Sequence, residues 1–100
     1  MNSMELIEQF NNERGWGVFH NEKDLALSIC LEASELLEIF QWRSAEAGRQ
    51  DTEALQDEIA DVLIYTYMLA DKLGFDIDDL IQRKLAKNAI KYPVEDNRDH

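Results

Sequence analysis

The chain has 100 residues, of which 45% are hydrophobic, and its 21 acidic and 10 basic residues give a net charge of −11. One hundred residues form a single domain with a modest core, and the hydrophobic content excludes a disordered acidic tail. The acidic balance excludes a general nucleic-acid coat, because binding to a phosphate backbone requires a basic surface. A small phosphorylated ligand held through metal ions is compatible with this charge.

The sequence predicts a cytoplasmic protein. Its single cysteine, Cys30, lies in an apolar run and has no partner for an internal disulfide, which fits a reducing compartment. The first ten residues lack the basic and apolar regions of a signal peptide. No uninterrupted apolar stretch approaches the ~20 residues of a membrane span. We therefore expect neither secretion nor attachment to a membrane.

The first predicted element is a helix with Ser3 as its N-cap, which extends to about Glu13. Its apolar residues recur at helical spacing and form one stripe: Met4, Leu6, Ile7 and Phe10. The segment RGWGVFH, residues 14–20, breaks this pattern. Two glycines flank Trp16 and indicate a loop that positions a large ring, and Asn21 can cap the element that follows.

The second helix is predicted from Glu22 to Arg43. It is apolar over much of its circumference, which is typical of a helix packed on more than one side. Residues 44–50 are predicted to form a surface loop. A third helix over residues 52–73 should stop at Gly74.

The last helix is capped by Asp76 and ends by Tyr92, before the single proline. Residues 1–93 then make one domain, and residues 94–100 are expected to form a flexible tail. Strand-like alternation is absent from the sequence, so we predict an all-α fold with a four-helix bundle-like protomer. The two long central helices should form an antiparallel hairpin, because the segment between them is short.

Two pairs of carboxylates lie in these central helices: Glu32 with Glu35, and Glu58 with Asp61. The i, i+3 spacing places both members of a pair on one helix face. None of the four has a basic residue three or four positions away. An antiparallel hairpin can bring the pairs together, where burial and mutual repulsion would raise their pKa values. A divalent cation removes this penalty, and all-oxygen ligands suit Mg²⁺ or Mn²⁺.

The acids have two other interpretations. Carboxylate di-iron centres use Glu-x-x-His twice, whereas Glu35 and Asp61 occupy the fourth positions here, which argues against iron. A non-catalytic helical interaction module with a solvated acidic face stays open as the alternative; it predicts dispersed acids and no stabilisation by Mg²⁺. Because Mg²⁺ usually shares its shell with a phosphate substrate, the metal interpretation favours phosphoanhydride hydrolysis.

The arrangement E-x-x-E, a gap of 22 residues and E-x-x-D resembles the signature of the MazG-like superfamily of all-α nucleoside triphosphate pyrophosphohydrolases. The segments RGWGVFH, ELLEIFQW, EIADVLIY and KLAKNAIKYP are similar, in order and spacing, to segments of the small dCTP pyrophosphatases. The resemblance covers about residues 5–93. It implies an Mg²⁺-dependent enzyme of nucleotide-pool housekeeping that cleaves a nucleoside triphosphate, dCTP-like or dATP, to monophosphate and pyrophosphate. Another phosphoanhydride, such as a phosphoribosyl-nucleotide, would use the same site.

The resemblance also implies roles for individual residues. The four carboxylates Glu32, Glu35, Glu58 and Asp61 match the Mg²⁺ ligands. Glu35 and Glu38 are the catalytic candidates, although Glu38 is equally explained as the next exposed acid. Trp16 matches a residue that stacks on the base, and His20 matches a residue near it. The other positions that match the nucleotide pocket are Trp42, Tyr65, Lys84, Asn88 and Tyr92.

Some of these assignments have structural alternatives. Trp42 and Tyr65 also suit core or interface packing. Basic residues near the end of the last helix are expected from the helix dipole, although Lys84 and Asn88 share one face. Ile7 replaces a polar, ring-bearing residue of some dCTP-specific relatives, which leaves the preferred base open. The family usually forms homodimers or homotetramers, and we expect one of these here, with residues from neighbouring chains in the pocket.

Overall fold

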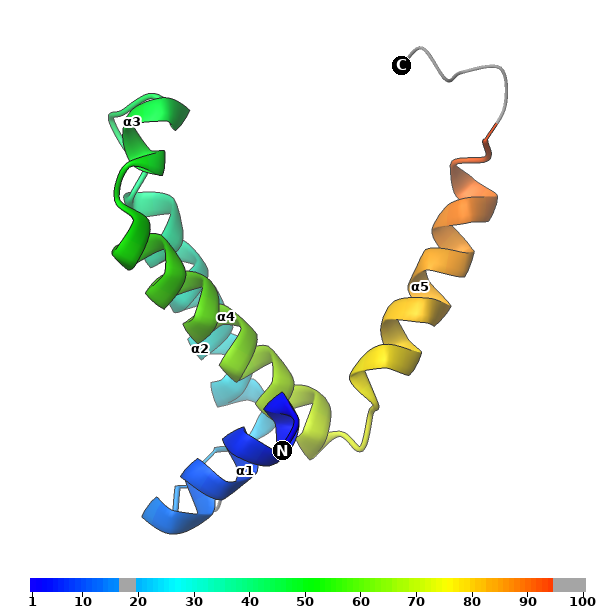
Figure 1. Cartoon of the computed structure of the whole chain (residues 1–100). Coiled ribbons are helices and arrows are strands. Elements are labelled where there is room, and N and C mark those ends of the chain that lie inside the picture. The colour runs from blue at the N-terminus through cyan, green and yellow to red at the C-terminus, as the bar shows by residue number, and fades with distance from the viewer. Residues whose placement is uncertain (17–19, 95–100) are drawn as a thin grey trace.

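The computed structural model describes residues 1–16 and 20–94 (Figure 1). Residues 17–19 of the predicted loop and 95–100 of the predicted tail lie outside the described residues. The described residues form five helices: α1 (Ser3–Arg14), α2 (Glu22–Glu38), α3 (Ala45–Arg49), α4 (Thr52–Lys72) and α5 (Ile77–Lys91). The predicted all-α class is confirmed. None of the five helices is long and apolar enough to cross a membrane.

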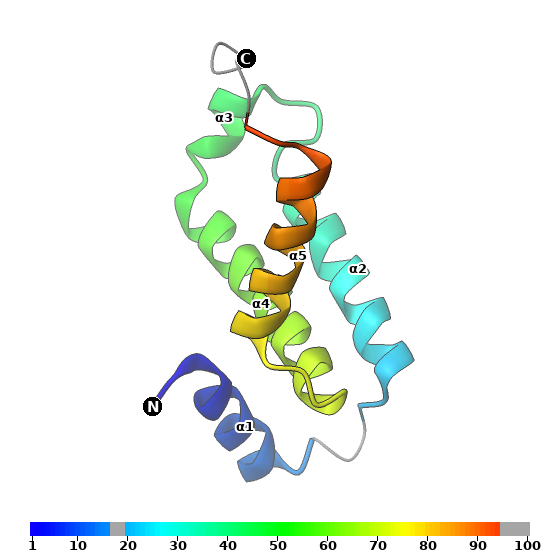
Figure 2. The ribbon, with the colours of Figure 1, turned by 90° about the vertical axis from the view of Figure 1, so that its right-hand side faces the viewer.

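The antiparallel hairpin predicted for the central helices is present as α2 and α4 (Figures 1 and 2). Its most buried side chain is Leu25, near the start of α2, which is 1% exposed. Ile39 and Ala70 are the other buried apolar residues in the described part of the chain. α1 packs against α4 at the end of the hairpin where α2 begins. The core therefore follows the α2–α4 seam and is small.

Side chains cap four of the five helices, and three of these caps are on α1, α2 and α5. α1 begins with Asn2 as its N-cap instead of Ser3, and Asn2 forms a reciprocal capping box with Glu5 through hydrogen bonds of 2.9 and 3.2 Å. Asn21 and Asp76 cap α2 and α5, as predicted. Each accepts a hydrogen bond from the backbone N–H three residues later, at 2.8 and 3.0 Å respectively.

The connection between α2 and α4 differs from the prediction. α2 ends at Glu38 and does not continue to Arg43. Trp42 has a φ of 63°, a left-handed conformation that a helix cannot include, so the chain leaves the helix in turns. Residues 45–49, which were predicted to lie in a loop, form the short helix α3. Its cap is the Ser44 hydroxyl, which accepts a backbone hydrogen bond at 3.1 Å.

α5 diverges from the α2–α4 hairpin (Figure 1). Gly74, with a φ of 76° that glycine adopts at little cost, ends α4 and starts the change of direction. None of the residues of α5 is buried. Its apolar residues Leu85 and Ile90 are 60% and 84% exposed. In one chain, α5 therefore leaves the bundle open on one side.

Candidate active site

Carboxylates from α2 and α4 meet in the hairpin. Glu32, Glu58 and Asp61 each have a carboxylate oxygen within 4.8 Å of those of the other two. All three side chains are half-buried. Glu58 and Asp61 share one face of α4 because of their i, i+3 spacing, and the antiparallel packing brings Glu32 of α2 opposite them. We refer to these three residues as the acidic cluster.

The pKa values of the two glutamates in this cluster are shifted upwards. Burial raises the pKa of Glu32 from its ordinary value of 4.5 to about 7, and a hydrogen bond with Asp61 and repulsion by Glu35 add to the shift. Burial also raises the pKa of Glu58, with further contributions from Glu35 and Asp61. Within residues 1–16 and 20–94, no Lys or Arg forms an ion pair with these acids. Their negative charge is therefore uncompensated by the described residues.

The donor atoms of the cluster fit a divalent cation. Glu58 Oε2 is buried and has no hydrogen-bond partner in the described part of the chain, so its desolvation is not offset by the protein. Carboxylate oxygens are hard ligands, which favour Mg²⁺ or Mn²⁺ over zinc. Oxygens in one Mg²⁺ shell lie about 3–4 Å apart, so small side-chain rotations would bring the observed oxygens to that spacing.

The two catalytic candidates lie further along α2. Glu35 is exposed one turn after Glu32, and it lies close enough to Glu58 to raise the pKa of that residue. Glu38 is the exposed last residue of α2. The structure thus groups three of the four predicted metal ligands and places Glu35 beside them. Glu38 lies outside the acidic cluster.

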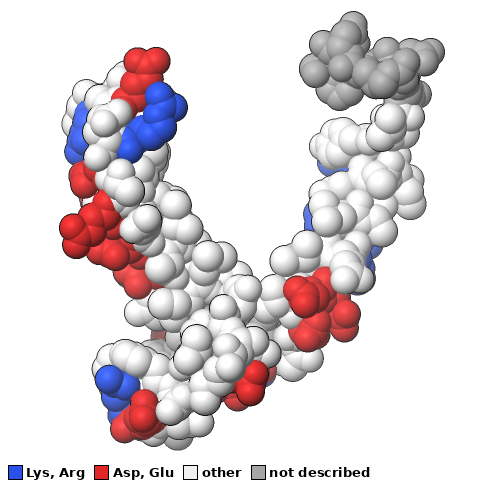
Figure 3. All heavy atoms as spheres, viewed as in Figure 1, with Lys and Arg blue, Asp and Glu red and all other residues white. Residues whose placement is uncertain are grey.

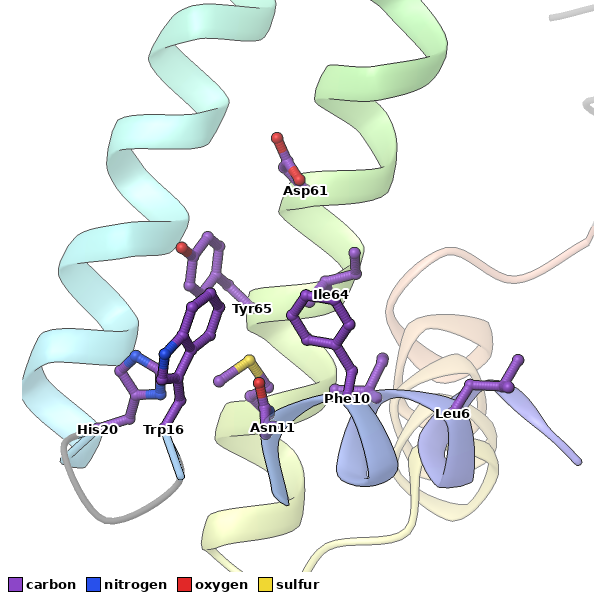
Figure 4. A pocket seen from close by; sticks show the side chains of 10 residues that line it. Leu6, Phe10, Asn11, Trp16, His20, Asp61, Ile64 and Tyr65 are labelled. Atoms are coloured by element: carbon purple, nitrogen blue, oxygen red, sulfur yellow. The ribbon is translucent and has the colours of Figure 1, made fainter. Parts of the chain in front are cut away.

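A cavity of about 660 Å³ lies beside the cluster (Figure 4). Asp61 belongs both to the cluster and to the cavity wall, so the two sites are continuous. Trp16, His20 and Tyr65, which the sequence predicted to bind substrate, line the same cavity. Apolar side chains from α1 and α4 supply the remaining wall, apart from Asn11: Leu6, Ile7, Phe10, Ile64 and Met68.

The end of α1 holds Trp16 in place. Gly15 has a φ of 65°, which turns the chain so that the Trp16 N–H donates to the Asn11 carbonyl at 3.0 Å. The rings of Phe10 and Trp16 meet edge to face, with centroids 5.5 Å apart. The Arg14 guanidinium lies 3.6 Å from the Phe10 ring centroid. Trp16 remains 47% exposed, so part of its ring is available to a flat ligand.

Three further polar residues line the cavity: His20, Tyr65 and Asn11. His20 Nδ1 is buried and has no hydrogen-bond partner among the described residues. Tyr65 is half-buried, one helical turn from Asp61. Asn11 also lines the cavity, and sequence reasoning missed it. The available signal was its position four residues after Ile7, which places the two on the same face of α1.

Four other residues that the sequence predicted to bind substrate are not brought to this cavity by a single chain. Trp42 is 94% exposed in the turn after α2, at the end of the hairpin remote from α1. Lys84 and Asn88 lie on α5, and Tyr92 follows it directly. Because α5 diverges from the hairpin, these side chains are separated from the acidic cluster (Figure 1). The predicted nucleotide pocket is only partly assembled in one protomer.

The chain matches known proteins over most of its length. The model of the MazG-like family matches residues 27–100. dCTP pyrophosphatase 1 from Rattus norvegicus is 40% identical over 99 residues, which cover 93% of this chain and 58% of that protein. dCTP pyrophosphatase 1 from Homo sapiens is 37% identical over 95 residues, which cover 89% and 56%. The chain thus spans less than two thirds of the length of these relatives.

A solved structure shares the fold. The crystal structure of a pyrophosphatase from Archaeoglobus fulgidus superposes with a TM-score of 0.85 and is 41% identical in sequence. The match covers 91% of this chain and 89% of that chain. The arrangement of helices described above is therefore found in an experimentally determined relative of similar length.

Proposed function

The chain belongs to the MazG-like family, and from this premise we propose that it is an Mg²⁺-dependent nucleoside triphosphate pyrophosphohydrolase. The observation that carries the proposal is the acidic cluster, which contains a buried, unpartnered carboxylate oxygen and adjoins a cavity lined by Trp16. The expected reaction converts a deoxynucleoside triphosphate to the monophosphate and pyrophosphate, as cytoplasmic nucleotide-pool housekeeping. The lone Cys30, which forms no disulfide, is consistent with that compartment.

The acidic cluster and Glu35 would hold the metal, with Mn²⁺ as a substitute for Mg²⁺. The bound ion would neutralise triphosphate charge and lower the pKa of a coordinated water. The protein's own part is to hold these carboxylates near one another through the α2–α4 packing, so that only small side-chain rotations are needed to bind the metal. Glu35 and Glu38 are the proposed acceptors of the proton from the attacking water, a role worth about 10²–10⁴ in rate.

The cavity beside Asp61 is the proposed site for the base. Its volume of about 660 Å³ lies within the ~300–1,000 Å³ of small-molecule pockets. Trp16 would stack on the base, with His20 and Tyr65 at its periphery. Because the cavity adjoins the acidic cluster through Asp61, a base in the cavity would leave its phosphates near the metal ligands.

We propose dCTP or dATP as the substrate class. The support comes from the relatives, which are named dCTP pyrophosphatase 1 and share up to 40% of their residues with this chain over the matched region. Ile7 contributes an apolar surface to the cavity. It therefore offers no hydrogen bond that would distinguish cytosine from adenine. For this reason both dCTP and dATP belong to the proposed substrate class.

A second copy of the chain is the proposed partner of α5. The chain exposes 8057 Å² of surface, whereas a compact protein of this size exposes about 5,800 Å². The excess is in the range of an obligate dimer interface, which buries about 2,000 Å² or more. The surfaces that α4 and α5 turn towards each other are almost free of charged residues (Figure 3). Packing of α5 on a second hairpin would cover its exposed leucines and isoleucines.

This packing would also complete the active site. Lys84 and Asn88 share one face of α5 at i, i+4 spacing. In the proposed homodimer, or a homotetramer built from it, they would approach the triphosphate bound by the acidic cluster of the partner. Lys84 would then supply positive charge to the phosphates, and Asn88 and Tyr92 would contact the nucleoside.

The proposal is tested by pyrophosphate release from a panel of deoxynucleoside triphosphates, with and without Mg²⁺. We expect release from dCTP or dATP only with the metal, and a loss of at least about 100-fold in Glu58→Gln. Glu53→Gln, an exposed position on the same helix, is the matched control and should keep activity. If no nucleotide releases pyrophosphate and Mg²⁺ does not raise the melting temperature, the non-catalytic acidic module replaces this proposal.

A further inference from the structure

Asn11 is a polar residue of the cavity that the site assignments above do not use. It lies on α1 in the cavity wall, between Phe10 and Trp16, and its side chain points into the cavity (Figure 4). It is half-buried. Its carboxamide forms no side-chain hydrogen bond with the described residues, whereas Asn2, Asn21, Ser44 and Asp76 use their side chains as helix caps.

The backbone fixes Asn11 relative to the ring that would stack on the base. The Asn11 carbonyl accepts the Trp16 N–H at 3.0 Å, across the left-handed turn at Gly15. The Phe10 ring also contacts the Trp16 ring, edge to face. The backbone of Asn11 is therefore fixed next to Trp16, and its carboxamide lines the same cavity as the Trp16 ring.

The apolar part of the wall cannot distinguish bases of similar size. Leu6, Ile7, Phe10, Ile64 and Met68 offer no hydrogen bonds, and an apolar wall discriminates only weakly between isosteres. Asp61 belongs to the acidic cluster and faces the phosphates in the proposed function. Asn11 carries a donor and an acceptor side by side, which is the combination needed to pair with two adjacent groups on a base edge.

We propose that Asn11 is the specificity-determining residue of the cavity. Its carboxamide would read the exocyclic amino group and the adjacent ring nitrogen that cytosine and adenine share. This inference rests on the proposed function and deepens it, because one contact then explains a preference for both dCTP and dATP. His20, whose Nδ1 is buried without a partner in the described chain, is the second polar group at this end of the cavity.

The test compares dCTP with its analogue that lacks the 4-amino group, in the wild type and in Asn11→Leu. We expect the wild type to favour dCTP in kcat/KM, and Asn11→Leu to lose about tenfold for dCTP, equivalent to 1.4 kcal/mol. The loss should appear in KM, because the base contact is made equally in the ground and transition states. The preference over the analogue should disappear in this variant. Asn12→Leu, at the exposed neighbouring position outside the cavity, is the matched control and should behave as the wild type.

Binding of dCMP, followed by tryptophan fluorescence, separates this inference from the proposed reaction. Weaker dCMP binding by Asn11→Leu than by Asn12→Leu supports the inference even if no nucleotide is hydrolysed. Equal dCMP affinity in the two variants overturns it, and so does hydrolysis of dCTP by Asn11→Leu with the discrimination of the wild type. Absence of dCMP binding in all proteins also overturns it.

Discussion

At the residue scale, the acidic cluster combines two opposing demands. Its three carboxylates are close together, and burial favours the protonated forms of Glu32 and Glu58, yet metal binding requires ionised carboxylates. Mg²⁺ binding therefore competes with protons at the cluster. This makes the metal-free protein and the Mg²⁺-bound protein respond differently to pH.

We predict that the metal-free protein loses stability as pH rises from about 4.5 through about 7. The folded-state pKa of Glu32 is raised to about 7, so between these values the folded chain binds more protons than the unfolded chain. Stability then falls with increasing pH. The measurement is the melting temperature in EDTA at pH 5.5 and pH 8, where the second value should be lower.

Two controls identify the cause of this pH dependence. Glu32→Gln should show a smaller decrease than the wild type, because it removes the titrating group. Saturating Mg²⁺ at pH 8 should restore the melting temperature of the wild type, since the ion binds the folded, ionised cluster. A melting temperature in EDTA that is unchanged or higher at pH 8 would be incompatible with a desolvated cluster.

At the element scale, the connection between α2 and α4 carries the main difference from the sequence prediction. Helical periodicity continues through Phe40 and Trp42, which is why the second helix was extended too far. The end of α2 depends on the left-handed backbone of Trp42 and on the presence of α3. Gly48 of α3 packs against the Phe40 ring. Such a contact between segments eight residues apart is not encoded in local propensity.

The long helices and the acidic cluster could be predicted from the sequence because local interactions determine them. Caps such as Asn21 and Asp76 are local hydrogen bonds, so their residue types reveal them. The i, i+3 spacing of Glu58 and Asp61 fixes their common face, and a short connection fixes the antiparallel pairing. Asn11 was missed because its position in the cavity beside Trp16 depends on the turn at Gly15.

We predict that Gly48→Ala destabilises the protein. A Cβ at this buried position would overlap the Phe40 ring. Overpacking costs about 1–3 kcal/mol, which exceeds the ~1 kcal/mol that alanine gains over glycine within a helix. Urea unfolding should therefore give a lower free energy of unfolding, by up to about 2 kcal/mol.

The same substitution in a Phe40→Leu background tests the contact itself. Leucine lacks the ring atoms that the new Cβ would meet, so the penalty of Gly48→Ala should be smaller there, as a non-additive pair. A stabilising Gly48→Ala in the wild-type background would mean that α3 does not pack on Phe40.

At the scale of the whole molecule, a single chain is too open for its size. Its radius of gyration is 17.0 Å, against about 13 Å for a compact domain of 100 residues. Leu25, Ile39 and Ala70 are the apolar residues buried in the described part, which is a small core for a stable domain. The proposed second copy over α5 would account for both observations.

We predict that two inactive variants restore activity to each other. Glu58→Gln removes a proposed metal ligand of the cluster, and Lys84→Gln removes the proposed phosphate contact on α5. If α5 completes the partner's site, a mixed dimer has one site with both defects and one with neither. Co-refolded in equal amounts, the variants should regain about a quarter of wild-type activity, since half of the dimers are mixed.

Glu58→Gln mixed with Glu32→Gln is the matched control for this experiment. Both substitutions lie in the acidic cluster of one chain, so every site keeps one defect and activity should stay low. A monomeric mass in solution, or no recovery when Glu58→Gln is mixed with Lys84→Gln, would contradict the assignment of α5 to the partner's site.

We propose above all that the acidic cluster holds a metal that directs cleavage between the α and β phosphates. Phosphorus NMR of dCTP incubated with the protein tests it most directly, because it identifies every phosphorus product. We predict one dCMP and one pyrophosphate for each dCTP consumed, with Mg²⁺ present and not in EDTA. Formation of dCDP and orthophosphate, or the same turnover in EDTA, would contradict the account.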